Sequence, residues 1–348
     1  MLDEAYRNLN MLPVRPDWLA RRREEAIDPA LPIVDPHHHL WRMPQCPYLI
    51  EDLAADAAAG HRVVATVYVE AHTAYRREGP EALRPVGETE FVVSEIARQE
   101  ARTGASTPLC AGIVGAADLA LGDRVEEVLE AHIAAGRGRF RGVRLRAAAH
   151  PDPAFAPPTG APPEGFLLRP EVQKGASCVG RLGLALDVWV FQTQLRDVAA
   201  LAAACPGTRM VLNHVGGVLG IGPFAGRRGE VFPTWREDLR ALARFGNMHV
   251  KLGGLCMPRV GFRFHKAELP PGSAELAAAW RPYVETCIEA FGASRCMFES
   301  NFPVDKGMCG YVEAWNAFKR IASGAGDAER ADLFAGTAQR VYRLDASG

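Results

Sequence analysis

The chain has 348 residues, and 48% of them are hydrophobic, which is enough to bury a large core. Its 40 basic and 41 acidic residues leave a formal net charge of −1, so there is no electrostatic reason to expect nucleic acid or an anionic membrane as a partner. The sequence contains no apolar run of about 18 residues, and no transmembrane helix is predicted.

Residues 1–30 are charged and contain prolines, and we interpret them as an N-terminal arm ahead of the first strand. They lack the apolar segment of roughly 7–15 residues that a secretory signal requires. The eight cysteines form no CxxC pair, and several stand in apolar runs, where a free cysteine behaves as a small hydrophobe. We therefore expect reduced cysteines and a cytoplasmic protein.

From residue 31 onward, short apolar runs alternate with longer helical patterns. The apolar residues of the short runs are almost continuous, which is typical of strands buried on both faces of a parallel sheet. Eight strands are predicted, at 32–35, 63–69, 109–114, 140–145, 184–190, 210–213, 248–252 and 296–299. Helices are predicted at 122–135, 195–204, 234–245, 275–291, 311–321 and 328–342.

Eight strands that alternate with helices predict a (β/α)8 TIM barrel of the α/β class, in one domain over residues 31–348. A doubly wound sheet is the alternative, but no GxGxxG motif follows the first strand. A long segment rich in Pro, Ala and Gly, 147–170, follows the fourth strand. On the catalytic face of a barrel it would be either a lid or a passive surface loop.

The first strand runs into a group of histidines, His37, His38 and His39, with Asp35 two residues before His37. Because side chains alternate along a strand, Asp35, His37 and His39 are expected on one face and His38 on the other. Two imidazoles at the carboxyl end of a barrel strand can bind a metal ion or transfer a proton. The alternative is a buried, hydrogen-bonded histidine cluster without function.

The segment DPHHHLW, which contains these histidines, resembles the DxHxHxW signature of the amidohydrolase-related (type 2) family of the amidohydrolase superfamily. The segments VLNHVGG, NMHVKLGGL and RCMFESNFPVD are similar, in order, to the family's motifs on the sixth, seventh and eighth strands. The resemblance implies a distorted TIM barrel. It also implies chemistry of the family's kind, because members include lactonases that open sugar or dicarboxylate lactones, and some decarboxylases.

The resemblance places His214 as the sixth-strand histidine, which faces the substrate, although a lone histidine can also be a helix-capping loop residue. Asn301 stands where the family has an aspartate that binds metal or activates water. An amide cannot accept a proton at neutral pH and ligates metals weakly. Two carboxylates could compensate, and we predict Glu299 as the catalytic residue first and Asp305 second. The alternatives are an ion pair of Glu299 with Lys251 or with an arginine on another strand, and a helix-capping or solvated Asp305.

The two-metal members that this chain resembles carry a carboxylated lysine on the fourth strand and a histidine on the fifth. Neither residue type occurs in the corresponding runs 140–146 and 186–190. A single divalent ion, with zinc preferred, is therefore expected through His37, His39 and a third ligand, Glu299 or His214. A site without metal is the alternative.

Arg144 and Arg146 share a face of the fourth strand, where guanidinium groups suit a substrate carboxylate or an oxyanion. The alternative is packing and salt bridging inside the barrel. His72, Trp41 and Asn301 are further candidates for contact with the substrate. Glu70 shares a face with His72 and would either reach the pocket or orient His37 or His39.

The predicted function is hydrolysis of a lactone, ester or similar carbonyl bond in a small carboxylated metabolite by water that Glu299, Asp305 or the metal activates. His214, an arginine or the metal would stabilise the developing oxyanion. One alternative is a non-oxidative decarboxylase of an aromatic or muconate-type acid. Another is a catalytically inactive barrel that acts as a binding protein, for which Asn301 is the main support. The expected partner is a small-molecule substrate, and a homo-oligomer would form if the N-terminal arm reached a neighbouring copy.

Overall fold

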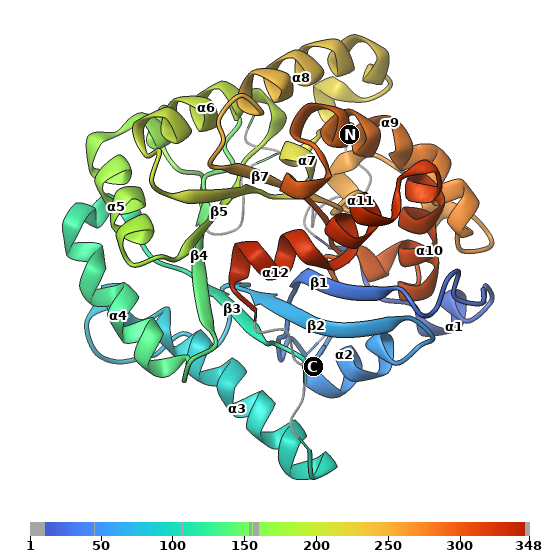
Figure 1. The fold of residues 1–348 in the computed structure, drawn as a ribbon, viewed down its shortest axis with the longest axis horizontal. Helices are drawn as coiled ribbons and strands as arrows, with labels where there is room; N and C mark the ends of the chain where they lie inside the picture. The colour runs from blue at the N-terminus through green and yellow to red at the C-terminus, as the bar shows by residue number, and fades with distance from the viewer. Residues whose placement is uncertain (1–10, 45, 106–107, 153–154, 156–159, 345–348) are drawn as a thin grey trace.

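The computed structural model describes residues 11–344 except 45, 106–107, 153–154 and 156–159. Eight parallel strands lie side by side in chain order (Figure 1). The strands are β1 (Pro32–His38), β2 (Arg62–Val69), β3 (Gly112–Gly115), β4 (Phe140–Arg146), β5 (Ala185–Trp189), β6 (Arg209–Leu212), β7 (Met248–Leu252) and β8 (Cys296–Phe298). The end of β1 meets the segment after β8, because His39 N donates to Phe302 O at 2.8 Å and Asn301 N donates to His37 O at 2.9 Å. The predicted (β/α)8 barrel is confirmed.

Most of the helices surround the strands on the outside of the barrel, while α12 crosses one end of it and α7 lies inside the ring of outer helices, as Figure 1 shows. They are α1 (Pro16–Leu19), α2 (Ile50–Ala57), α3 (Val86–Thr103), α4 (Val125–Ala135), α5 (Pro170–Arg181), α6 (Leu195–Ala204), α7 (His214–Gly217), α8 (Arg228–Leu242), α9 (Ser273–Phe291), α10 (Tyr311–Ile321), α11 (Asp327–Ala331) and α12 (Thr337–Tyr342). All eight predicted strands are present, with ends that shift by a few residues. The six predicted helical segments are also present, whereas α1, α2, α3, α5 and α7 were not predicted.

The C-terminal helix α12 closes the amino-terminal end of the barrel and crosses it in the view of Figure 1. Its apolar side chains form one buried cluster with residues from the barrel strands. The cluster includes Val34, Val67, Val114, Val211 and Met297 from the strands, and Ala338, Val341 and Tyr342 from the helix. The barrel interior is therefore packed at this end.

One expectation about the first strand is wrong. Asp35 does not share a face with His37, because its carboxylate accepts from Ser300 N at 3.0 Å and from the Tyr311 hydroxyl of the outer helix α10 at 3.1 Å. The pairing of β1 with β2 shifts register between Asp35 and His38. Such an irregularity changes which side chains point inward. Simple alternation therefore fails for Asp35, while His37 still points into the barrel.

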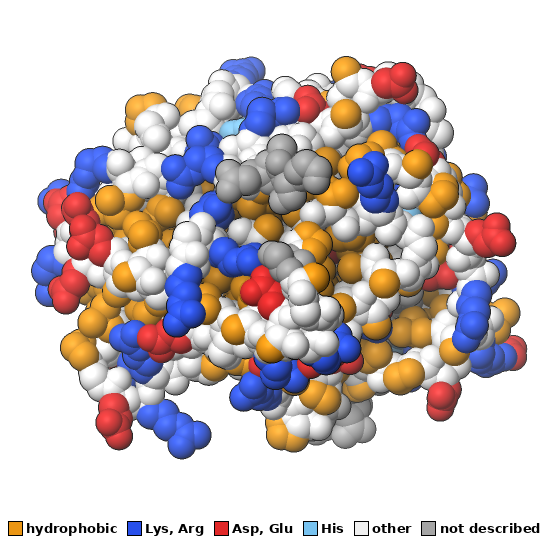
Figure 2. Space-filling view, turned by 60° about the horizontal axis from the view of Figure 1, so that its bottom comes forward, with side chains coloured by type: hydrophobic (Ala, Val, Ile, Leu, Met, Phe, Trp, Pro, Cys, Tyr) orange, Lys and Arg blue, Asp and Glu red, His pale blue; other side chains and the backbone are white. Residues whose placement is uncertain are grey.

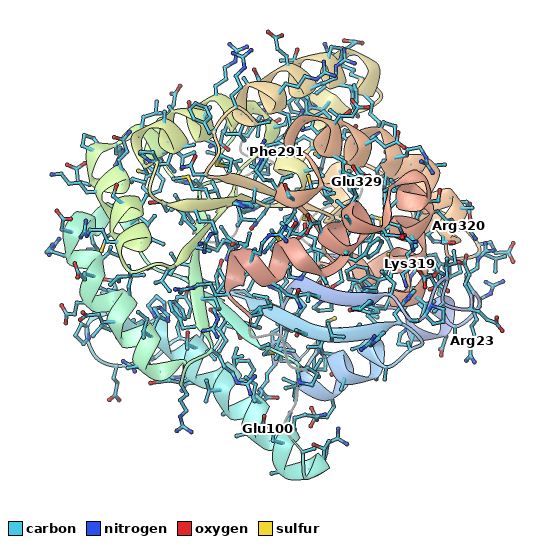
Figure 3. All side chains as sticks on the ribbon, viewed as in Figure 1. Arg23, Glu100, Phe291, Lys319, Arg320 and Glu329 are labelled. Carbon is cyan, nitrogen blue, oxygen red and sulfur yellow. The ribbon has the colours of Figure 1, made fainter. Side chains whose placement is uncertain are left out.

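The described part of the N-terminal arm, residues 11–31, lies along its own barrel. It contacts α9 and α10, and Figure 3 labels Arg23 of the arm beside Lys319 and Arg320 of α10. Asn316 of α10 accepts from Ile27 N at 2.7 Å, and Lys319 Nζ donates to Ile27 O at 2.8 Å. The arm thus runs from the start of β1 back towards the other end of the barrel.

The segment between β4 and α5 is long, as predicted, and contains the short 3-10 helix Phe166–Leu168. Part of it lies outside the described residues, so the choice between lid and passive loop stays open. Figure 2 shows basic and acidic side chains interspersed over the face in view, as the balanced charge predicts. No helix in the described part of the chain is long and apolar enough to cross a bilayer. All eight cysteines are free.

Candidate active site

A pocket of about 270 Å³ opens at the carboxyl end of the barrel strands. Its lining includes all five residues that were predicted to contact the substrate, together with His39 and His214. The lining residues are Met11, His39, Trp41, Met43, Ala71, His72, Arg144, Arg146, Trp189, His214, Met257, Asn301 and Val304. The position agrees with the general rule that TIM-barrel enzymes carry their sites at this face.

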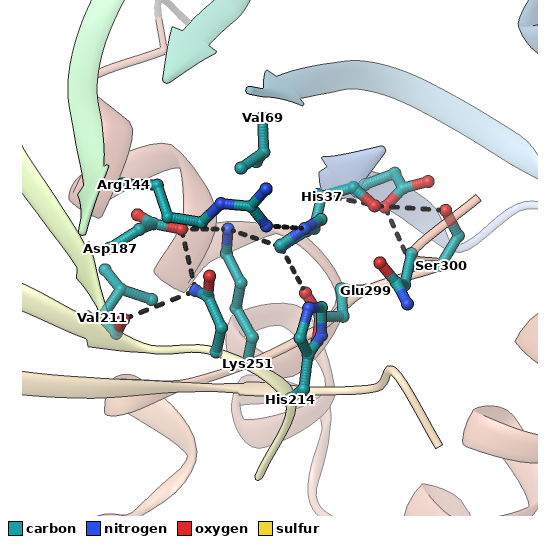
Figure 4. Close-up of polar contacts among 12 residues, drawn as sticks. His37, Val69, Arg144, Asp187, Val211, His214, Lys251, Glu299 and Ser300 are labelled. Carbon is teal, nitrogen blue, oxygen red and sulfur yellow. Dashed lines mark hydrogen bonds and ion pairs between the residues drawn. The ribbon is translucent and has the colours of Figure 1, made fainter. Parts of the chain in front are cut away.

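His37 lies beneath the pocket and is fully buried between two cationic side chains (Figure 4). Lys251 Nζ is 3.2 Å from its Nδ1, and Arg144 Nη1 is 3.4 Å from its Nε2. Burial lowers the pKa of His37 well below its ordinary value, and Lys251 lowers it further. The ring is therefore neutral near pH 7.

Lys251 of β7 and Asp187 of β5 form a buried ion pair that sequence reasoning did not place in the site. Their charged atoms lie 2.6 Å apart, and both side chains are fully buried. The other carboxylate oxygen of Asp187 accepts from the Tyr342 hydroxyl of α12 at 2.7 Å. Asn213 Nδ2 donates to Asp187 at 2.9 Å. The available signal was a lone charged residue within each of two otherwise apolar strands.

His214 and Glu299 form the second polar pair of the site. His214 Nδ1 is 2.7 Å from Glu299 Oε1, and both residues are buried. His214 begins the single turn α7 directly after β6, and Glu299 directly follows β8. Because His214 lines the pocket while its Nδ1 contacts Glu299, Nε2 is the nitrogen left for a substrate or water.

The glycine pair after β7 makes room for this contact. A Cβ on Gly253 would lie 2.4 Å from Glu299 Cγ, and a Cβ on Gly254 would lie 2.4 Å from His214 Nδ1. Gly254 also has a positive φ of +65°, which side chains other than glycine rarely adopt. The GG of the seventh-strand motif is therefore explained by the close approach of His214 and Glu299.

Burial shifts both partners towards their neutral forms. It raises the pKa of Glu299 to about 8, although the Lys251 ammonium acts in the opposite direction. It lowers the pKa of His214 well below the ordinary value, helped by the positive charges of Arg144 and Lys251. A neutral imidazole with a free Nε2 can accept a proton.

Asn301 lines the pocket, and Asp305 lies behind it. Asn301 Nδ2 is 2.8 Å from Asp305 Oδ1, and Cys256 N donates to Asp305 Oδ2 at 3.0 Å. Burial raises the pKa of Asp305 to about 8. Asp305 is absent from the pocket lining, whereas Asn301 is part of it. Glu299 is absent from the lining as well, but it contacts the lining residue His214, whereas Asp305 contacts Asn301. The ranking of Glu299 before Asp305 stays a prediction.

Glu70 fixes the arginines of β4. Arg144 Nε donates to Glu70 Oε1 at 2.7 Å, and Arg146 Nη1 lies 3.8 Å from Glu70 Oε2. Although burial acts to raise it, the pKa of Glu70 is lowered by Arg144 and Arg146. Glu70 therefore holds Arg144 against His37. It is absent from the pocket lining, and its ion-pair partners are arginines rather than His37 or His39. His72 contacts Glu70 through its backbone N at 3.1 Å.

Aromatic rings pack against both pocket histidines. His39 stacks on Trp41 with ring centroids 5.7 Å apart, and its Nδ1 is 2.7 Å from Val69 O. Trp189 of β5 meets His214 edge-on at 4.9 Å. Trp189 thus lines the pocket.

The cluster of His37, His214 and Glu299 fits a divalent metal ion. Each of these residues offers one ligand atom, and these atoms all lie within 4.8 Å of one another. Glu299 Oε2 lies 2.9 Å from His37 Nδ1 without forming a hydrogen bond, so this buried oxygen lacks a partner of that kind. Two imidazoles and a carboxylate are a common donor set for zinc. The cluster has His214 in place of His39, whose role as a ligand stays a prediction.

Comparisons with known proteins agree with this geometry. The amidohydrolase family model matches residues 34–344. An uncharacterized protein of Sinorhizobium fredii is 31% identical over 90% of this chain and 98% of its own length. An L-fucono-1,5-lactonase of Burkholderia multivorans is 29% identical over 89% of this chain and 96% of its own length. The crystal structure of a Burkholderia multivorans amidohydrolase with bound zinc superposes with a TM-score of 0.67 at 26% identity, covering 90% of this chain and 99% of that one.

Proposed function

The chain belongs to the amidohydrolase family and is a hydrolase, and on this premise we propose that it hydrolyses a lactone or related ester of a small carboxylated molecule. The lactone is favoured by the two L-fucono-1,5-lactonases among its relatives, at 29% and 26% identity. The carboxylate is favoured by the paired guanidinium groups of Arg144 and Arg146 at the pocket.

The contact between His214 Nδ1 and Glu299 Oε1 carries the proposal. When Glu299 is ionised, as it is above its raised pKa of about 8, its carboxylate accepts from Nδ1–H, holds the imidazole in one orientation and leaves Nε2 without a proton. Nε2 then takes a proton from water as the water oxygen attacks the carbonyl carbon. The same proton passes to the leaving oxygen when the ester bond breaks, which yields the hydroxy acid.

Arg144 stabilises the oxyanion that forms on the carbonyl oxygen. Its guanidinium is held by Glu70, so the donors are oriented before the reaction begins, and such preorganised donors are often the largest catalytic contribution. Arg146 is less buried than Arg144 and binds the substrate carboxylate. Asn301 positions the substrate by hydrogen bonding, in place of the aspartate that the family carries.

We further propose that the ion held by His37, His214 and Glu299 is zinc. The support is the donor set and the zinc in a relative of 26% identity. When bound, zinc would supply Lewis-acid activation of water and of the carbonyl group. Lys251 lies beside His37 Nδ1, so we expect it to weaken the binding of a dication by charge repulsion.

The test is turnover of a lactone panel, followed by acid release and by the mass of the product. Glu299→Gln keeps the side-chain shape but removes the carboxylate that orients His214, and we expect kcat to fall by about 10²–10⁴-fold, because the general base is then held in the wrong tautomer. His214→Gln should cause a loss of the same order, and the double variant should lose little more, because the pair acts as one unit. Carbon dioxide release instead of ring opening would support the decarboxylase alternative, and ligand binding without turnover would support a binding protein.

A further inference from the structure

The pocket separates its polar side chains from its apolar ones. The polar residues stand at or just after strand ends: Arg144 and Arg146 on β4, and His39, His72, His214 and Asn301 after β1, β2, β6 and β8. Apart from Trp189 at the end of β5, the apolar lining comes from loops and from the N-terminal arm: Met11, Trp41, Met43, Ala71, Met257 and Val304. A ligand that fills this pocket therefore meets its polar partners at one end and carbon over the rest of its surface.

Three of the apolar side chains are methionines from three separate segments. Met11 belongs to the arm, Met43 to the loop after β1, and Met257 to the loop after β7. Met43 is 37% exposed at the mouth of the pocket. Its loop is closed by two backbone hydrogen bonds between Trp41 and Tyr48, at 2.8 and 3.0 Å. Methionine is flexible and polarisable, so it adapts to apolar ligands of varied shape.

Met11 is held at the pocket because the arm behind it is anchored at several points. Leu12 is 5% exposed and packs directly over Gly307. Trp18 Nε1 donates to Ala267 O and Glu268 O at 3.2 and 3.1 Å. Further along, Glu24 accepts from the backbone N of Ser273 at 2.8 Å. The arm is thus a fixed wall of the site.

From this separation we infer that the substrate is amphipathic: a carboxylated lactone or ester whose body carries alkyl or aromatic carbon, with Met11 of the arm as a specificity-determining residue. The inference rests on the proposed function. A polyhydroxylated lactone would bury hydroxyl groups against methionine and valine side chains, and an unsatisfied buried hydroxyl is costly. The volume of about 270 Å³ has room for about nine water molecules, so the body is small.

The experiment compares two kinds of δ-lactone in the full-length protein. One series carries a carboxylate and an n-alkyl substituent that grows by one methylene at a time, and the other kind is hydroxylated, with L-fucono-1,5-lactone as the probe. We expect kcat/KM to rise about fourfold for each added methylene until the pocket is full. We also expect the hydroxylated lactone to be turned over more slowly than every alkyl member.

Two substitutions of Met11 test whether this residue of the arm causes the preference for alkyl substituents. Met11→Gln keeps the length of the side chain but adds an amide, and should cut the alkyl-to-hydroxylated ratio of kcat/KM by about tenfold, roughly the value of one or two buried methylenes. Met11→Leu should keep the ratio within about twofold, because hydrophobic swaps of similar volume are tolerated. Ile133→Gln, at a 40% exposed position on α4, is the control for adding an amide elsewhere.

The outcomes separate the two proposals. Turnover that favours the hydroxylated lactone, or a ratio that Met11→Gln leaves unchanged, overturns the inference while the hydrolase function stands. If no lactone or ester of either kind is hydrolysed, the proposed function itself fails. An alkyl preference that Met11→Gln reduces and Met11→Leu retains supports the inference.

Discussion

Lys251 is the residue on which the charge arrangement of the site depends. Its ammonium contacts Asp187 at 2.6 Å and His37 at 3.2 Å, and no part of the side chain is exposed. A buried charge is tolerated only when it is paired and hydrogen-bonded. The ion pair therefore ties β7 to β5 and fixes the ring of His37 between them.

Removal of Lys251 alone should destabilise the fold strongly. Lys251→Met leaves Asp187 charged and unpaired in the barrel, and we expect the free energy of unfolding to fall by about 3–5 kcal/mol in urea denaturation. Lys251→Met combined with Asp187→Asn should recover a large part of this loss. Arg196→Met, which breaks the exposed pair with Asp238, is the control and should change stability far less. Equal losses of unfolding free energy in Lys251→Met and Arg196→Met would contradict the role given to Lys251.

The residues of the site differ in how far the sequence reveals them. His37, His214 and Glu299 follow from motifs at strand ends, because chemistry in a barrel gathers there. The ion pair between Lys251 and Asp187 was not predicted, because the two residues are far apart in the sequence and only the barrel brings their strands together. Asp35 was placed on the wrong face, because a register shift in β1 cannot be read from alternation.

At the scale of elements, strands were easier to predict than helices. A strand buried on both faces is an unbroken apolar run, and all eight were found within a few residues of their observed ends. Helix α3 was missed because it buries polar side chains, among them Glu88, Thr89, Glu95 and Gln99. Such residues interrupt the apolar stripe by which an amphipathic helix is recognised.

The turn after β7 offers a test of how elements position His214. Gly254→Ala places a Cβ 2.4 Å from His214 Nδ1 at a φ of +65°, so His214 must move away from Glu299. We expect kcat to fall by at least tenfold, since misplacement by about 1 Å can cost 10²-fold. Gly246→Ala, just before β7, meets no atom within 4 Å and is the matched control. Unchanged kcat in Gly254→Ala would show that the His214–Glu299 contact is dispensable.

Helix α12 reaches the same site from the opposite end of the barrel through Tyr342. Tyr342→Phe keeps the ring, which lies 5.1 Å from Lys251 Nζ, but removes the hydrogen bond to Asp187. We expect a loss of about 1.5–3 kcal/mol in unfolding free energy, as for a hydrogen bond to a charged group. We also expect a lower kcat, because Asp187 then holds Lys251 less firmly. Tyr283→Phe removes a hydroxyl that contacts Arg228 outside the barrel, and it should leave kcat unchanged.

Across the whole molecule, burial favours the protonated form of several carboxyl groups. Burial raises the pKa of Asp35 to about 6, and it raises those of Glu88, Glu299 and Asp305 to about 8. The same burial lowers the pKa values of the site histidines. The folded protein therefore holds protons on its buried carboxyl groups more tightly than the unfolded chain does.

This difference predicts how stability depends on pH. A carboxyl group whose folded pKa is raised stabilises the fold fully below its ordinary value of 4.5, and this contribution disappears as the pH rises through about 8. The histidines act in the other direction: their contribution is present above 6.5 and lost as the pH falls. We expect the unfolding free energy to decline from about pH 6.5 to 8, where the carboxyl groups act alone.

Glu88→Gln tests whether buried carboxyl groups cause this decline in stability, at a position outside the pocket. Glu88 is 1% exposed, accepts from the Tyr68 hydroxyl at 2.5 Å, and has a second oxygen without a hydrogen bond. Burial and the nearby charge of Glu70 raise its pKa. The amide cannot ionise, so the unfolding free energy should decline less steeply between pH 6.5 and 8 when it is measured by urea unfolding across this range. Glu130→Gln, at an exposed position, is the control and should leave the decline as steep as before. A slope that is equally steep in both variants would mean that Glu88 does not ionise as the barrel unfolds.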